Sequence, residues 1–128
     1  MDTAVQQAKK IFGDYNLCAD LFEFAKIHAE SFDVVILTEV IEHVDRPLDF
    51  IESIKQLLIP GGHTIITTPN KSFFPSDVVW ATELPPVHCR WFSEESMKFA
   101  AKEKNLEIDF INFRRFYQKN PLTVDLKK

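Results

Sequence analysis

Two carboxylates and an imidazole stand close together in the run Glu39-Val40-Ile41-Glu42-His43. If a helical turn begins at Glu39, residues three and four apart share one face, with Cβ atoms about 5–6 Å apart. Two carboxylates at such a distance repel each other unless a cation is present, so the group predicts a metal site or a general-base site. A second interpretation stays open, in which Glu42 and His43 are solvent-facing cap residues and Glu39 meets a helix N-terminus.

His88 is the candidate for a fourth metal ligand. It follows Pro85-Pro86 in a long loop that could fold back over the end of a strand. Two carboxylate oxygens and two imidazole nitrogens would suit Mg, Mn, Fe or Zn, and the ligand set does not choose among them. The alternative is that His88 is a surface residue of the loop, as most loop histidines are.

Asp20 is a third polar residue of interest, because it follows a short run that we expect to be a strand. Its carboxylate could accept a hydrogen bond from an adenine amino group or a ribose hydroxyl. Aspartate is equally common at such a place as a turn former or a helix cap. The sequence leaves both interpretations open.

The elements that must position these residues alternate between helical and extended patterns. We expect helices over 3–12, 21–28, 47–58 and 94–105. Asp45 would cap the third of them, which Pro60-Gly61-Gly62 would stop, and Ser93 would cap the fourth. We expect strands at Tyr15–Ala19, Phe32–Leu37, His63–Thr68, Leu106–Phe113 and Leu122–Leu126. The apolar run Phe32–Leu37 is typical of a strand covered on both faces. This alternation predicts an α/β fold with a mainly parallel sheet, whose ligands bind beyond the carboxyl ends of the strands. Asp20, Thr38, Glu39 and Asn70 fall at that edge.

Composition limits the function classes. The 128 residues suffice for a single domain, 1–128, and 45% of them are apolar, so we expect a packed core. A net charge of -4 argues against charge-driven nucleic-acid binding, and the longest apolar runs are far shorter than the roughly 18 residues of a membrane span. The N-terminus lacks a signal-peptide pattern, so we expect a cytoplasmic protein, with Cys18 and Cys89 as free thiols.

Three stretches together resemble class I S-adenosylmethionine-dependent methyltransferases, in the branch that includes ubiquinone-biosynthesis O-methyltransferases. They are Phe32–Val44 (FDVVILTEVIEHV), Leu57–Gly62 (LLIPGG) and Thr67–Asn70 (TTPN), and the resemblance covers roughly residues 3–113. It implies a partial Rossmann-like fold with helices on both faces of the sheet, and S-adenosylmethionine as cofactor. By the same resemblance, Asp20 and Leu21 would hold the adenine, and Thr38 and Glu39 would lie beside the methionine part.

The arrangement of Glu39, Glu42, His43 and His88 is also similar to the E-x-x-E-H and distant His of small-RNA 2′-O-methyltransferases, which hold a divalent metal against the acceptor hydroxyls. The resemblance therefore implies a metal site here. The alternative is that this stretch is the family's ordinary packing of its fourth strand into the following helix.

One part of the family pattern has no counterpart in this sequence. No G-x-G turn occurs among its three glycines, and Met1 falls where the segment after the second strand's acidic residue would be. Without the first two strands, the third (Tyr15–Ala19) and fourth (Phe32–Leu37) would lack their partners. We therefore expect either the C-terminal part of a longer gene product or a rearranged sheet, and a marginally stable isolated chain.

The resulting function hypothesis is methyl transfer from S-adenosylmethionine to an unidentified small-molecule acceptor, with His43 as base or a metal lowering the acceptor's pKa. We expect weak activity or none from these residues alone. The alternative is a non-catalytic binding or dimerisation module derived from a methyltransferase, forming a homodimer through an exposed sheet edge. Neither hypothesis involves nucleic acid or membrane.

Overall fold

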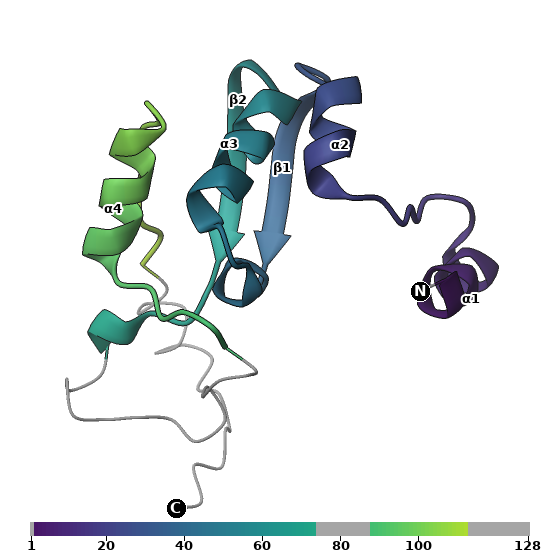
Figure 1. The fold of residues 1–128 in the computed structure, drawn as a ribbon, viewed down its shortest axis with the longest axis horizontal. Helices are drawn as coiled ribbons and strands as arrows, with labels where there is room; N and C mark the ends of the chain where they lie inside the picture. The colour runs from purple at the N-terminus through teal and green to yellow at the C-terminus, as the bar shows by residue number, and fades with distance from the viewer. Residues whose placement is uncertain (1, 74–87, 113–128) are drawn as a thin grey trace, which may run out of the picture.

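The computed structural model describes residues 2–73 and 88–112 (Figure 1). Its elements are, in chain order, α1 (Asp2–Phe12), α2 (Leu21–Ile27), β1 (Phe32–Thr38), the 3-10 turn η1 (Ile41–His43), α3 (Pro47–Leu57), β2 (Leu58–Thr67), the 3-10 turn η2 (Lys71–Phe73) and α4 (Glu94–Glu103). β1 and β2 run parallel and α3 connects them, so the central unit is β-α-β. This confirms the α/β class with a parallel sheet.

The register of the two strands is regular over the stretch that leads to the site. It runs from Val34 opposite His63 to Thr38 opposite Thr67, but an irregularity lies between Phe32 and Val34. The expected helix stop at Pro60 is wrong in detail, because α3 ends at Leu57 and the following residues already belong to β2. Gly62 fits here because a Cβ would lie 3.0 Å from two backbone oxygens.

The core lies between the sheet and α3, α4 and the segment before α4. Its buried residues are Ile41, Ile51, Phe92 and Ala100, with Leu37 and Ile66 of the sheet packed against them. Full burial of a side chain such as that of Ile51 stabilises the fold by about 1.5–3 kcal/mol. α3 begins at Pro47, and no side chain caps its N-terminus, so the expected cap at Asp45 is wrong. The expected cap of α4 by Ser93 is confirmed.

The opposite face of the sheet stays open in the described part of the chain. Val34, Ile36 and Ile65 point to that face, and Ile36 is 64% exposed. The expected burial of β1 on both faces is therefore not found, because the described helices α2 and α3 lie on one side of the strands (Figure 1).

Two other expected strands are wrong where the structure describes them. Residues 15–19 are irregular, and Tyr15 is 92% exposed. Residues 106–112 are also irregular, although Leu106 packs on the core. A strand requires a hydrogen-bonded neighbour, and the described sheet consists of β1 and β2. Residues 74–87 of the expected loop, and the candidate strand at 122–126, lie outside the described residues.

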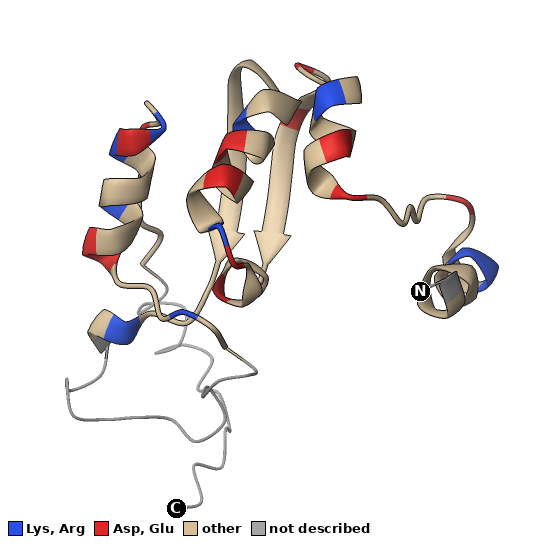
Figure 2. Cartoon of the chain, in the orientation of Figure 1, with Lys and Arg blue, Asp and Glu red and all other residues tan. Residues whose placement is uncertain are grey.

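Charged residues of both signs occur along α2, α3 and α4 (Figure 2). Some of them join helices: Lys104 Nζ lies 3.4 Å from Glu52 Oε2, and Lys55 Nζ donates to the Lys104 carbonyl at 2.8 Å. These contacts fasten the end of α4 to α3. Cys18 and Cys89 are free thiols, as expected, and none of the helices within 2–73 and 88–112 has the length and apolar character of a membrane span.

Candidate functional site

The site is built where β1 ends and the chain turns. Glu39 adopts a φ of 51°, in the left-handed region, and its backbone N–H donates to the Thr67 carbonyl at 3.0 Å. The chain then enters η1, whose residue Ile41 is fully buried in the core. The turn therefore starts two residues later than the spacing suggested, and it is a 3-10 turn.

This turn carries the Glu42 side chain into the protein, where only 1% of it remains exposed. Carboxylate atom Oε2 accepts a hydrogen bond from Thr68 Oγ1 at 2.9 Å. Oε1 is buried and accepts no hydrogen bond from the described residues, and it lies 3.8 Å from His43 Nε2. A buried carboxylate oxygen without a donor is costly unless a cation or a proton satisfies it.

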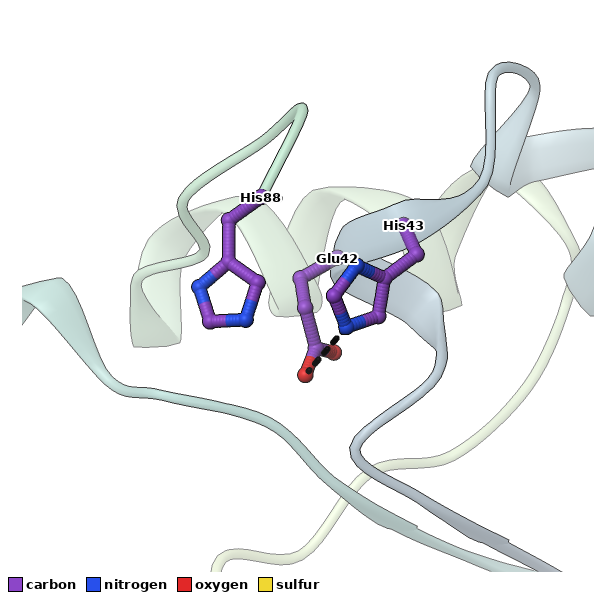
Figure 3. A group of neighbouring side chains, drawn as sticks. All are labelled: Glu42, His43 and His88. Atoms are coloured by element: carbon purple, nitrogen blue, oxygen red, sulfur yellow. Dashed lines mark ion pairs between the residues drawn. The ribbon is translucent and has the colours of Figure 1, made fainter. Parts of the chain in front are cut away.

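His88 completes a group of three with Glu42 and His43 (Figure 3). The two imidazole rings have centroids 4.6 Å apart at an angle of 64°, and one potential ligand atom from each of the three residues lies within 4.8 Å of the others. The His43 side chain is 41% exposed, whereas that of Glu42 is 1% exposed.

Hydrogen bonds from Cys89 and Arg90 fasten the segment that carries His88 to the segment after β1. The backbone N–H groups of Cys89 and Arg90 both donate to the Glu42 carbonyl, at 3.0 and 3.2 Å. The Arg90 guanidinium donates to the carbonyls of Val44 and Asp45. Chain segments about 45 residues apart in sequence are thus brought together at one place.

One carboxylate and two imidazoles form a donor set that suits a divalent cation such as zinc, and the same set suits proton removal from a hydroxyl. The ligands of one tetrahedral ion at about 2.1 Å lie about 3.4 Å apart. Separations of up to 4.8 Å therefore mean that the side chains would have to close by about 1 Å around an ion.

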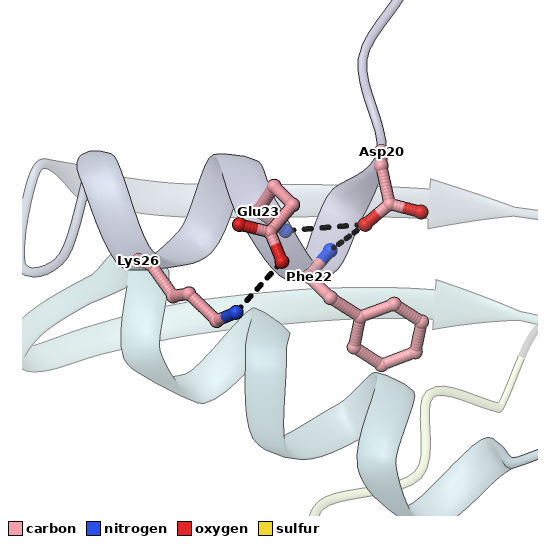
Figure 4. A network of polar contacts seen from close by, with 4 residues as sticks. All are labelled: Asp20, Phe22, Glu23 and Lys26. Carbon is pink, nitrogen blue, oxygen red and sulfur yellow. Dashed lines mark hydrogen bonds and ion pairs between the residues drawn. The ribbon is translucent and has the colours of Figure 1, made fainter.

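The structure places the other predicted site residues at the same edge but outside this group. Within the described residues, Glu39 is not one of the three, and its side chain is exposed. Thr38 is the exposed last residue of β1. Asp20 lies at the end of the sheet where both strands end, and Oδ1 accepts from the backbone N–H groups of Phe22 and Glu23 at 2.9 and 3.1 Å (Figure 4).

Asp20 is therefore a helix N-cap, one of the two interpretations that the sequence left open, and this role leaves its contact with a cofactor untested. Leu21 follows it as the half-buried first residue of α2. A salt bridge of 2.7 Å between Lys26 and Glu23 lies on the next turn (Figure 4). Both contacts lie within α2 and stabilise its N-terminal end.

Two residues of the site were missed by the sequence analysis. Thr68 orients the Glu42 carboxylate, and a signal for it existed, because Thr68 follows the strand that neighbours β1. Arg90 fastens the His88 segment, and no local pattern indicates that role.

Comparison with known proteins identifies the family of the chain. The family model of the methyltransferase domain matches residues 3–109, and the chain belongs to that family. It is 45% identical over 58 residues to the mitochondrial ubiquinone biosynthesis O-methyltransferase of Rattus norvegicus, a match of 45% of this chain and 16% of the relative. The human counterpart is 42% identical over 59 residues, 46% of this chain and 16% of the relative.

The Dictyostelium discoideum enzyme of the same name is 48% identical over 44 residues, which make up 34% of this chain and 14% of the relative. The matched part of the chain thus spans less than a quarter of the length of these relatives. No solved structure matches the chain significantly.

Proposed function

We propose that the chain is part of an S-adenosylmethionine-dependent methyltransferase that methylates a hydroxyl group of a small-molecule acceptor. The observation that carries the proposal is the group of Glu42, His43 and His88 at the carboxyl edge of a β-α-β unit in a methyltransferase domain. The named relatives are O-methyltransferases of ubiquinone biosynthesis, which supports an oxygen acceptor.

The residues at the strand ends are assigned to the cofactor. Asp20 and Leu21 would hold the adenosine part, and Thr38 and Glu39 the methionine part. The structure is compatible with this assignment, since Thr38 and Glu39 are exposed and the strands and α2 bring all four residues to one edge. Bound there, S-adenosylmethionine supplies an electrophilic methyl group.

The three-residue group is assigned to the acceptor. In the transfer, the acceptor oxygen bonds to the methyl carbon as the carbon–sulfur bond breaks, and the hydroxyl proton must leave. His43 is partly exposed beside a buried carboxylate and would accept this proton as a base. Alternatively, a divalent cation held by Glu42, His43 and His88 would acidify the hydroxyl, and Glu39 would join only if its side chain moved.

Cofactor binding is tested by isothermal titration of the 128-residue chain with S-adenosylmethionine. Micromolar binding supports a cofactor site within these residues, and no binding contradicts it. Asp20→Ser is the informative variant, because serine also caps helices while the carboxylate is lost. We expect Asp20→Ser to bind the cofactor more weakly at unchanged thermal stability.

The metal is tested by titrating the chain with Mn²⁺ and Zn²⁺. His43→Ala and His88→Ala should each weaken binding, whereas His63→Ala is the matched control, since His63 is an exposed histidine of β2 outside the group. Unchanged affinity in both the His43 and the His88 variants would discard the metal and leave His43 as the base.

A second candidate function is a non-catalytic binding or dimerisation module, and the open face of the sheet favours it. Val34, Ile36 and Ile65 are exposed there, and β1 has an unpaired edge in the described sheet. Sedimentation velocity distinguishes the two: a dimer that Ile36→Lys dissociates, together with no cofactor binding, supports the module.

A further inference from the structure

His88 is held in the site by contacts of the residues that follow it. The backbone N–H groups of Cys89 and Arg90 share a single acceptor, the Glu42 carbonyl. These two donors form the attachment nearest to His88. Further along the same segment, the Phe92 carbonyl accepts from the Lys71 backbone N–H at 2.7 Å and Phe92 is buried in the core, so the segment is also held beyond Arg90.

The Arg90 side chain supplies a further point of attachment. Its Nε lies 3.4 Å from the Val44 carbonyl, and its Nη2 donates to the Asp45 carbonyl. These acceptors lie two and three residues beyond Glu42 along the chain. A planar guanidinium that donates from two nitrogens fixes direction as well as distance.

We propose that Arg90 is a positioning residue that sets the place of the His88 imidazole beside Glu42 and His43. The chemical meaning of this role rests on the proposed function, in which the three residues bind a cation or activate the acceptor. The positioning itself is a statement about geometry, and it can be measured without cofactor, metal or acceptor.

The test is a nuclear Overhauser cross-peak between the ring protons of His43 and His88, whose centroids lie 4.6 Å apart. A second cross-peak, between Phe22 and Phe50 with centroids 6.4 Å apart, reports on the fold elsewhere in the same molecule. In Arg90→Ala we expect the histidine cross-peak to disappear and the phenylalanine cross-peak to remain. A retained histidine cross-peak in Arg90→Ala, or its absence from the parent chain, overturns the proposal.

Two further variants keep the test decisive. Arg46→Ala removes another guanidinium from the same part of the chain and should keep the histidine cross-peak. If Arg90→Ala loses both cross-peaks because it unfolds, Arg90→Lys decides, since lysine keeps the charge but lacks the planar guanidinium that donates from two nitrogens. A folded Arg90→Lys with a weakened histidine cross-peak supports the proposal, and one with an undiminished cross-peak refutes it.

Titration with Mn²⁺ separates this proposal from the proposed function. If the parent binds the ion, Arg90→Ala should lower the affinity about tenfold, as is usual for residues that orient metal ligands. The same substitution should have no further effect in a His88→Ala background. If the parent binds no ion but Arg90→Ala loses the histidine cross-peak, the metal is discarded and the positioning role of Arg90 stands.

Discussion

Thr68→Val tests how the Glu42 carboxylate is held. Valine keeps the β-branched shape of threonine but removes the hydroxyl that donates to Glu42 Oε2 at 2.9 Å. Since Glu42 is 1% exposed, water cannot readily replace the lost donor. The second carboxylate oxygen already lacks a hydrogen-bond donor among the described residues, so the variant carboxylate would have no donor on either oxygen.

The size of the effect follows from the charge and burial of the acceptor. A hydrogen bond to a charged group contributes about 1.5–3 kcal/mol, and an unsatisfied buried group costs a similar amount. We therefore expect Thr68→Val to lower the free energy of unfolding by about 1.5–3 kcal/mol. The same variant should also bind Mn²⁺ more weakly if Glu42 is a metal ligand.

Thr64 offers a matched control on β2, the strand that Thr68 follows. Its hydroxyl oxygen is buried and has no hydrogen-bond partner among the described residues. Thr64→Val therefore removes a buried hydroxyl that makes no hydrogen bond with the described residues. It should leave the free energy of unfolding unchanged or raise it by up to about 1 kcal/mol.

Urea denaturation followed by circular dichroism measures both variants. With a slope of about 1.5 kcal/mol/M, Thr68→Val should lower the unfolding midpoint by about 1–2 M. Midpoints of the two variants that agree within about 0.3 M would refute the reasoning, because the donor to Glu42 would then contribute nothing to stability.

Three further predictions concern the frame of the site. Ser93→Ala should lower the free energy of unfolding by about 1 kcal/mol in urea, because it removes the side chain that caps α4. Gly62→Ala should cost about 1–3 kcal/mol in the same assay, because its Cβ would lie 3.0 Å from two backbone oxygens. Lys9 lowers the pKa of Asp14 below its ordinary value of 3.8 by a hydrogen bond and by its charge. The stabilisation from this ion pair should be fully present above pH 3.8 and be lost as the pH falls through the lowered pKa of Asp14. A carboxyl NMR titration of Lys9→Gln should show the pKa of Asp14 return toward 3.8.

The sequence was sufficient for the elements whose signals are local. β1 is a run of β-branched and aliphatic residues and α3 begins at Pro47, so both were predicted within one residue at each end. For β2 the run from His63 was predicted, but the start of the strand at Leu58 was not. The run Tyr15–Ala19 carries a similar signal, but a strand forms only with a partner. Local sequence does not show whether that partner exists, which is why this prediction was wrong.

The same distinction applies to the site. Glu42 and His43 were predicted from their spacing, and His88 from its place in a long loop that could fold back over the end of a strand. The structure brings these three together. Glu39 lies outside the group because its own backbone is left-handed, with a φ of 51°, and η1 begins only at Ile41. The spacing argument assumed a helical turn from Glu39 onward. Thr68 contacts a residue 26 positions away and could have been found from its place after the strand that neighbours β1, whereas no local pattern reveals the contact of Arg90 with a residue 46 positions away.

The Glu42 carbonyl has a consequence for how this site can vary. It receives the main-chain N–H groups of residues 89 and 90, and every amino acid except proline supplies such a group. Related sequences can therefore exchange the side chains at both positions and still keep these two backbone hydrogen bonds, although a change of Arg90 would remove its side-chain contacts. Proline at either position would remove one of the two donors to this carbonyl.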